Sequence, residues 1–277
     1  MRKFDRPSEG AGFSIGVYGV KISIRSNRPE CLDRVWRHLP HGCKVIRSAT
    51  VDRVYSIVIG GDGSGQRPRR SSILYSDDVR LLRSANVDDV FDRLESDLRL
   101  FVAELAHDRV FVHAGVVGWQ GQGIVIPGRS FSGKSTLVAE LLRAGATYYS
   151  DEYAVFDKRG RVHPFLKDLE IRAADDWKQT RFAAASFGGR VGIKPIPVAK
   201  ILVTRYRDGG TWRPRRLSQG KAVLALLANT VSARRHPEKA LATLQKVVAE
   251  AQTLHGTRGE AKEFIPLILE GIGKKTV

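Results

Sequence analysis

The chain has 277 residues, of which 42% are hydrophobic, and it carries a formal net charge of +17. This length allows one large domain or two modest ones with real cores. The sequence contains no run of about 18 apolar residues, so we expect no transmembrane helix. Its start, MRKFDRPSEGAGF, lacks the apolar segment of a secretory signal, and two cysteines, Cys31 and Cys43, fit neither a disulfide scaffold nor a zinc pattern. We therefore expect a cytoplasmic protein with reduced thiols.

The positive charge is concentrated between Lys158 and Arg216, where 15 Lys and Arg residues accompany only 5 Asp and Glu residues. Such a segment forms either an ordinary solvated surface or a positive field around an anionic substrate. It shows no zinc-finger spacing and no aromatic RNA-binding segment, so nucleic acid is an unfavoured partner. Nucleotides, acidic peptides or proteins and anionic membranes remain open.

Residues 1–86 predict a small α+β domain. FSIGVYGVKISI alternates apolar and polar residues, PECLDRVWRHL predicts a helix, and four β-rich runs follow, namely CKVIRS, RVYSIVIG, SSILYS and VRLLRS. In VDDVFDRLESDLRLFVAEL the apolar residues recur on one helical face: Val90, Leu94, Leu98, Phe101, Val102 and Leu105. This predicted helix, from 87 to about 106, couples the first domain to a second one, which we assign to residues 87–277.

The second domain predicts alternating strands and helices, and hence an α/β protein. RVFVHAGVVGW and QGIVIPG predict two apolar strands, and KSTLVAELLRAG predicts a helix that stops at Gly145. TYYSDEYAVFD predicts one long strand or a strand pair, and further short strands follow to about Arg216. The chain is expected to end in helices, within KAVLALLANT, HPEKALATLQKVVAEAQ and EAKEFIPLILE.

The stretch IPGRSFSGKSTL has the spacing G-x-x-x-x-G-K-S of a phosphate-binding loop, with the required strand before it and helix after it. Its glycines let backbone N–H groups approach phosphate oxygens closely, and the helix adds its positive N-terminus. Lys134 is expected to reach the β- and γ-phosphates, and the Ser135 hydroxyl to ligate Mg²⁺. The expected nucleotide-binding residues are Gly128, Arg129, Ser130, Phe131, Ser132, Gly133, Lys134, Ser135 and Thr136.

Two acidic residues follow this loop closely, Asp151 at 17 and Glu152 at 18 residues after Lys134. A helix, a turn and a returning strand would bring them back beside the γ-phosphate, unless the pair is only a solvated strand edge. Such a near acid is typical of kinases with small or short acceptors, in which it deprotonates a hydroxyl while a neighbouring acid holds metal. Adjacent strand residues point to opposite faces, so we expect the two carboxylates to have different roles.

Two further segments hold weaker candidates. His113 in FVHAGVV lies on a predicted strand, where a histidine is more often a packed core residue than a functional one. Glu170 and Arg172 in DLEIR are two residues apart and therefore share one face of a strand, which could simply be exposed.

Together these segments resemble the C-terminal catalytic domain of HPr kinase/phosphorylase and its shorter relatives. The likeness covers residues 109–230 and rests on Val112-His113-Ala114, Gly128-x-Ser130-x-x-Gly133-Lys134-Ser135, Asp151-Glu152 and Leu169-Glu170-Ile171-Arg172. It implies the P-loop fold shared with phosphoenolpyruvate carboxykinases and, because the family is commonly oligomeric, a homo-oligomer. The nearest likeness is to HPr-kinase-related proteins, including kinases of lasso-peptide precursors, whose acceptor is a serine of a small peptide or protein.

The resemblance also implies catalytic and metal-binding roles. Asp151 would be the base towards the acceptor hydroxyl, with His113 near the acceptor, and Lys134 and Arg172 would neutralise phosphate charge. The implied Mg²⁺ ligands are Ser135 and one of Glu152 or Glu170. The segment NTVSARRHPEKAL is also similar to these relatives, and Arg234 or Arg235 could reach the active site.

The sequence departs from the family at three points. Ser132 replaces the second glycine of the loop, the acidic pair is Asp-Glu where the bifunctional enzymes have Asp-Asp, and AADDW replaces a glycine-rich continuation after LEIR. That continuation is tied to the phosphorylase reaction and to HPr docking, so neither is carried over to this chain.

The sequence therefore predicts an ATP- and Mg²⁺-dependent kinase that transfers the γ-phosphoryl group to a hydroxyl, in the first place a serine of a small protein or peptide. Two alternatives stay open. One is a kinase of a small hydroxyl compound, and the other is a nucleotide-binding regulatory protein without transfer activity.

Overall fold

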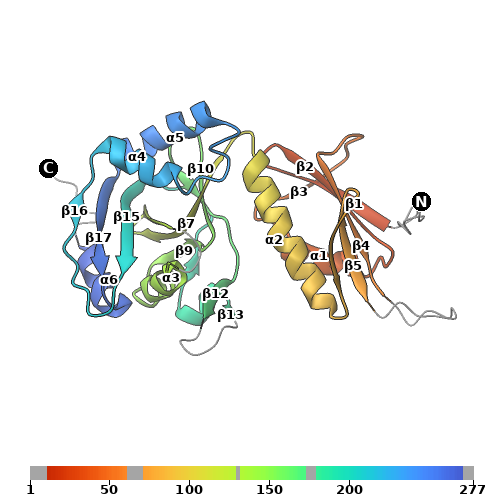
Figure 1. Cartoon of the computed structure of the whole chain (residues 1–277), viewed down its shortest axis with the longest axis horizontal. Helices are drawn as coiled ribbons and strands as arrows, with labels where there is room; N and C mark the ends of the chain where they lie inside the picture. Colours follow the sequence, from red (N-terminus) through yellow and green to blue (C-terminus); the bar gives the residue numbers. More distant parts are fainter. Residues whose placement is uncertain (1–10, 61–70, 129–131, 173–178, 271–277) are drawn as a thin grey trace. The chain divides into compact units, whose positions relative to one another are not determined.

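The computed structural model describes residues 11–60, 71–128, 132–172 and 179–270, without the side chains of Arg172 and Gln179. The chain divides into two compact units, residues 1–107 and 108–277, which are described separately here (Figure 1). Each unit combines helices with a mixed sheet that contains parallel strand pairs. The predicted α/β class is confirmed at this level.

The N-terminal unit is built on a sheet of six described strands in the order β3-β1-β2-β4-β5-β6. These strands are β1 (Ala11–Val17), β2 (Val20–Ser26), β3 (Lys44–Ile46), β4 (Arg53–Val58), β5 (Ser72–Ser76) and β6 (Val79–Ser84). Neighbours are antiparallel except β2 and β4, which are parallel. The chain reverses between β1 and β2 at Tyr18 and Gly19, both with positive φ, as a two-residue hairpin loop requires. A short helix, α1 (Cys31–Val35), continues into the 3-10 turn η1 (Trp36–His38).

The long helix α2 (Val87–Leu105) packs its apolar face against β5 and β6 of this sheet. The Asn86 side chain caps the helix by accepting a hydrogen bond from the backbone N–H of Asp88. The buried apolar face contains all the residues expected from the sequence except Leu105, which is half-buried. The predicted boundary is at residue 86, whereas the compact units divide after His107, because α2 packs against the first sheet.

The C-terminal unit contains a larger sheet with the main order β11-β10-β7-β8-β15-β17-β16. Its strands are β7 (Val110–Trp119), β8 (Gln122–Pro127), β9 (Thr147–Ser150), β10 (Tyr153–Phe156), β11 (Val162–His163), β15 (Val198–Tyr206), β16 (Arg215–Arg216) and β17 (Gln252–Arg258). The strands β8, β15 and β17 are mutually parallel, and β7 is antiparallel to β8. Both β9 and β10 pair with β7, so TYYSDEYAVFD is a strand pair that is interrupted at Asp151 and Glu152.

Smaller elements lie beside the sheet. The strand β14 (Arg190–Val191) pairs with β9, and it follows the 3-10 turn η2 (Ala184–Phe187). The strands β12 (Leu169–Arg172) and β13 (Gln179–Phe182) pair only with each other among the described residues, and they form an antiparallel ribbon.

Helices cover both faces of the larger sheet (Figure 1). One face carries α4 (Gln219–Leu227) and α5 (Pro237–Glu250), and the other carries α3 (Lys134–Arg143) and α6 (Ala261–Leu269). Alternate residues of β8 enter the two cores: Val125 packs with α4 and α5, and Ile124 and Ile126 pack with α3 and α6. The sheet is therefore the buried middle layer of three, and its strand ends are the parts free to form a site.

The strand β17 was not expected, because the sequence analysis predicted only helices after Arg216. Its sequence, QTLHGTR, holds a single large apolar residue, Leu254. It pairs with β15 along its whole length, from Lys200 opposite Gln252 to Tyr206 opposite Arg258. Backbone pairing with the buried parallel strand β15 places β17 in the sheet. Such pairing leaves no periodic pattern of apolar residues in the sequence.

Two expectations about the environment of the chain can be compared with the structure. No helix within the described ranges is long and apolar enough to span a lipid bilayer. The thiols of Cys31 and Cys43 are unbridged, and both residues are half-buried rather than fully buried.

The first prediction concerns Gly115, which lets α3 lie directly on β7. A Cβ at this position would be 2.7 Å from Cγ2 of Val138, a β-branched side chain that cannot easily turn away. We expect Gly115→Ala to lower the free energy of unfolding by about 1–3 kcal/mol, measured by urea denaturation.

Gly220, in the first turn of α4, is the matched control, because a Cβ there meets nothing within 4 Å. Gly220→Ala should be neutral or stabilising by up to about 1 kcal/mol. Adding Val138→Ala should make the loss caused by Gly115→Ala smaller than in the wild-type background. Equal losses in both backgrounds would contradict the proposed contact.

Candidate phosphate-binding and catalytic site

The site lies at one edge of the larger sheet, where the carboxyl ends of parallel strands meet. The loop after β8, the acidic pair after β9 and the ends of β15 and β17 all emerge at this edge, because these four strands run in the same direction. Antiparallel β7 brings its first half to the same edge, with Ala114 opposite Pro127. Open α/β sheets bind ligands at such edges.

The predicted phosphate-binding loop begins at Gly128, whose N–H donates to the backbone oxygen of His113 at 3.1 Å. Of the expected loop residues, Arg129, Ser130 and Phe131 lie outside the described ranges. Gly133 has φ +79 and precedes the first residue of α3, Lys134, as the predicted motif requires. The expected strand before the loop and helix after it are confirmed.

Ser132 lies against Gly128. A Cβ at Gly128 would be only 2.7 Å from the Ser132 hydroxyl oxygen. The serine therefore fills space that depends on the first glycine, and the loop accommodates it without losing the glycine that precedes α3.

The two hydroxyl residues after Lys134 differ in their surroundings. The Ser135 side chain is half-buried and hydrogen-bonds to the Asp151 carboxylate, whereas Thr136 is exposed. Lys134 is half-buried, and burial lowers the pKa of its ammonium group while nearby Asp151 opposes that change. The lysine, the serine and the aspartate therefore form one coupled group at the start of α3.

Asp151 is the most perturbed carboxylate of this group. Burial raises its pKa to about 6, although a hydrogen bond from Ser135, the charges of Lys134 and Lys167 and the backbone N–H of Glu170 all act to lower it. Its Oδ1 atom is buried and has no hydrogen-bond partner among the described residues. A carboxylate with a raised pKa and an open oxygen has the properties of a general base.

His113 lies on β7 opposite Tyr153, and the two rings are 4.7 Å apart. Burial lowers the pKa of His113, and the charge of Lys134 lowers it further. The imidazole is therefore neutral at pH 7 and adjoins the lysine of the loop. The backbone N–H of His113 donates to the backbone oxygen of Asn229, so the segment after α4 also reaches β7, but the Arg234 and Arg235 side chains are exposed.

The other predicted metal and phosphate ligands are placed less directly. The carboxylate of Glu170 pairs with Lys167 Nζ at 3.0 Å and with Arg181 Nε at 3.3 Å. Glu152 is half-buried at the break between β9 and β10, and its backbone oxygen accepts from the N–H of Ala114. The side chain of Arg172 lies outside the description. The backbone N–H of Glu170 thus contacts Asp151, whereas its carboxylate is paired with Lys167 and Arg181.

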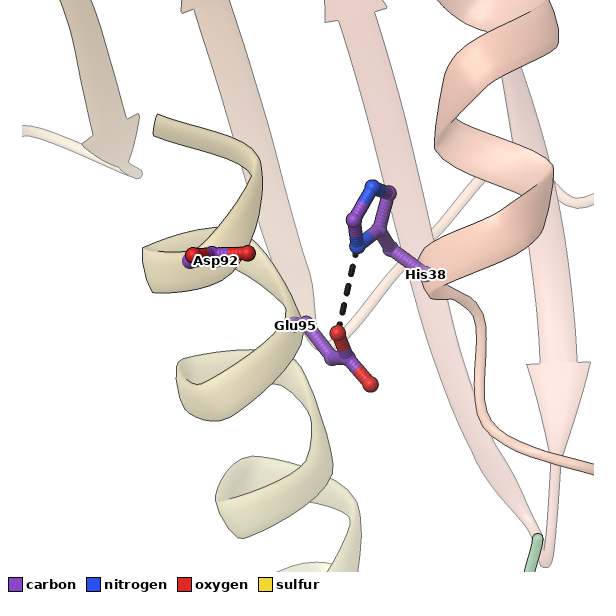
Figure 2. Close-up of side chains that lie close together, drawn as sticks. All are labelled: His38, Asp92 and Glu95. Atoms are coloured by element: carbon purple, nitrogen blue, oxygen red, sulfur yellow. Dashed lines mark hydrogen bonds and ion pairs between the residues drawn. The ribbon is translucent and has the colours of Figure 1, made fainter. Parts of the chain in front are cut away.

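The N-terminal unit contains a separate cluster that the sequence analysis did not identify. His38, Asp92 and Glu95 place their ligand atoms within 4.8 Å of one another (Figure 2). However, Glu95 already pairs with His38 Nδ1 at 3.2 Å and with Arg99 Nε at 3.2 Å. Because the buried carboxylate already contacts both neighbours, the cluster is explained as a polar contact between η1 and α2.

Sequence reasoning also missed Lys167 and Arg258 near the predicted site. Lys167 stands three residues before Glu170 in KDLEIR, so its spacing to the LEIR segment was a readable signal. Arg258 ends the unexpected strand β17 and places its Nη2 atom 3.4 Å from the backbone oxygen of Gly133. No local sequence pattern could predict that contact, because 125 residues separate Arg258 from Gly133.

Comparison with protein-family models and with curated proteins finds no match to this chain. The function therefore has to be inferred from the chemistry and the positions of the residues at this sheet edge.

The second prediction concerns the cost of burying Asp151. Because its pKa is about 6 in the folded chain and 3.8 ordinarily, the folded state binds more protons between these pH values. The free energy of unfolding therefore falls as pH rises through this window, by up to about 3 kcal/mol, because the buried carboxyl group loses its proton. Asp151→Asn should remove that loss, so its free energy of unfolding should exceed that of the wild type more at pH 7.5 than at pH 5.

Urea denaturation at both pH values, without nucleotide or metal, measures this difference. Asp168→Asn, at an exposed aspartate just before β12, serves as the control and should show no such pH-dependent gain. If the Asp151→Asn and wild-type curves stay parallel across the two pH values, the burial cost of this carboxylate has been misassigned.

Proposed function

We propose that the protein is an ATP- and Mg²⁺-dependent kinase that transfers the γ-phosphoryl group to a hydroxyl, most favourably a serine of a small protein or peptide. The observation that carries this proposal is the Asp151 carboxylate, buried with an open oxygen beside Ser135 and Lys134. The resemblance of four sequence segments to HPr kinase/phosphorylase supports it, because three of them lie at one end of the larger sheet and the backbone N–H of Glu170, in the fourth, donates to Asp151.

We further propose that the C-terminal unit has the P-loop fold of HPr kinases and phosphoenolpyruvate carboxykinases. Its support is the antiparallel strand β7 directly beside the P-loop strand β8, together with a near acidic pair on a strand that also pairs with β7. ATP as the phosphoryl donor is consistent with the cytoplasmic location expected from the sequence.

The donor atoms present fit a magnesium ion. The Ser135 hydroxyl at the start of α3 is a hard oxygen donor, and Glu152, next to Asp151, adds a carboxylate. Bound together with ATP, the ion would supply neutralisation of charge on the β- and γ-phosphates. Glu170 would join this set only by exchanging its contacts with Lys167 and Arg181.

In the proposed reaction, the oxygen of the acceptor hydroxyl bonds to the γ-phosphorus while Asp151 accepts the hydroxyl proton. The bond between the γ-phosphorus and the β,γ-bridging oxygen breaks, and ADP leaves. The Lys134 ammonium and the backbone N–H groups at the start of α3 stabilise the negative charge on the leaving ADP. A pKa of about 6 keeps Asp151 largely ionised at pH 7 and still basic enough to take a proton. The neutral His113 ring, beside Lys134, can hold the acceptor hydroxyl without adding charge.

A nucleotide-binding regulatory protein without transfer activity is the second candidate. The ion pairs that hold the Glu170 carboxylate favour it, because they withdraw one implied metal ligand from the site. Incubation with γ-labelled ATP and a panel of serine peptides, small hydroxyl compounds or no acceptor separates this candidate from a peptide kinase and from a small-molecule kinase.

The third prediction is that Asp151→Asn binds ATP with wild-type affinity but loses transfer. Removal of a general base should lower kcat about 10²- to 10⁴-fold. Titration calorimetry measures ATP binding and label incorporation measures transfer, with Asp168→Asn as the variant that should keep both. A wild-type transfer rate in Asp151→Asn would show that this residue is not the base.

The fourth prediction is an acid limb in the pH profile of transfer. The kcat/KM of the wild type should fall as pH drops below about 6, because Asp151 becomes protonated. His113→Gln should keep this limb at the same pH even if its rate is lower. Disappearance of the limb in His113→Gln would assign the titration to the histidine instead.

A further inference from the structure

A pocket of about 510 Å³ adjoins the start of α3 on the side of β15 and β17. Its lining includes Gly133, Thr136, Arg205, Tyr206, Arg258 and Glu260. Its volume lies within the usual range for small-molecule sites. We propose that this pocket binds the nucleoside part, ribose and base, of a nucleoside triphosphate whose phosphates lie on the loop. This inference rests on the proposed function and adds where the donor lies and which residues recognise it.

The order of strands across the sheet gives the direction of the bound nucleotide. Asp151 and His113 belong to the β9, β10 and β7 side, the loop follows β8, and the pocket lies at the ends of β15 and β17. The described lining residues include Thr136 but not Lys134, Asp151 or His113. Since the loop lysine reaches the β- and γ-phosphates while the loop amides cradle the α- and β-phosphates, the nucleoside leaves on the opposite side from the acceptor.

The distance across these strands suits such a ligand. From β7 to β17 there are three intervals between neighbouring strands, or roughly 14 Å at the usual strand spacing. An extended nucleotide can therefore place its γ-phosphate near β7 and its nucleoside near β17 while its phosphates rest on the loop.

Arg258 is the buried charge in this pocket, with only 3% of its surface exposed. Its Nη1 and Nη2 atoms donate to the backbone oxygens of Gly259 and Gly133, at 3.1 and 3.4 Å. Its Nε is buried and has no hydrogen-bond partner in the described part of the chain. A buried guanidinium with a spare donor, next to the loop, is suited to an α-phosphate or ribose oxygen.

Tyr206 and Glu260 form the outer wall. The Tyr206 hydroxyl donates to Glu260 Oε1 at 2.7 Å, which orients the carboxylate, and the tyrosine remains 47% exposed. A carboxylate held in this way can accept hydrogen bonds from ribose hydroxyls, and an exposed aromatic ring can stack on a base. The pocket thus offers a separate partner for each part of a nucleotide.

The test compares Mg–ATP with Mg–tripolyphosphate, which carries the phosphates without a nucleoside, by titration calorimetry on the full chain. Tyr206→Ala and Glu260→Ala should each weaken ATP binding about tenfold and leave tripolyphosphate binding unchanged. Glu263→Ala is the matched control, because Glu263 is an exposed acid in the first turn of α6 and does not line the pocket. It should bind both ligands as the wild type does.

A second measurement changes the ligand, so its first comparison involves the wild type alone. The wild type should bind 2′,3′-dideoxy-ATP more weakly than ATP, and Glu260→Ala should bind the two equally. If both variants bind ATP as the wild type does, or if the wild type does not distinguish the dideoxy compound, the pocket assignment is overturned while the kinase proposal stands. If the wild type binds neither ATP nor tripolyphosphate, the proposed function itself fails and the pocket assignment falls with it.

Discussion

The antiparallel pairing of β7 with β8 is the constraint on which the candidate site depends. Because β7 is antiparallel to β8, the first half of β7 lies beside the end of β8. The backbone oxygen of His113 there accepts a hydrogen bond from the N–H of Gly128. The same strand receives β9 and β10 along its other edge, so the acidic pair returns to the phosphate-binding loop. Gly115 on β7 allows α3 to approach closely, which brings Lys134 to the same place.

Two buried carboxylates of this protein show how surroundings decide chemistry. Glu95 in the N-terminal unit is buried against His38 and Arg99, which satisfy its charge, so its contribution is structural. Asp151 is buried with an open oxygen, and burial raises its pKa despite nearby lysines. The raised pKa of Asp151 allows this carboxylate to accept a proton near neutral pH. The two acids therefore differ in the neighbours that their carboxylates contact.

Three cations of the C-terminal unit lie close to residues of the candidate site. Lys167 and Arg181 hold the carboxylate of Glu170, while Arg258 is buried behind the loop with one donor unsatisfied. These cations come from segments far apart in the chain. Positive charge close to the candidate site favours a polyanionic ligand.

The sequence by itself determined the local elements and the loop: the strand before Gly128, the helix after it and the amphipathic face of α2 follow from short-range periodicity and glycine chemistry. It also determined that Asp151 returns to the loop, because a ten-residue helix and one strand leave little choice of path. Only the tertiary structure decided that α2 belongs to the first unit, that QTLHGTR is an inner strand and that Arg258 reaches Gly133. Those features depend on backbone pairing and burial between residues far apart in the chain, and neither leaves a periodic signature in the segment itself.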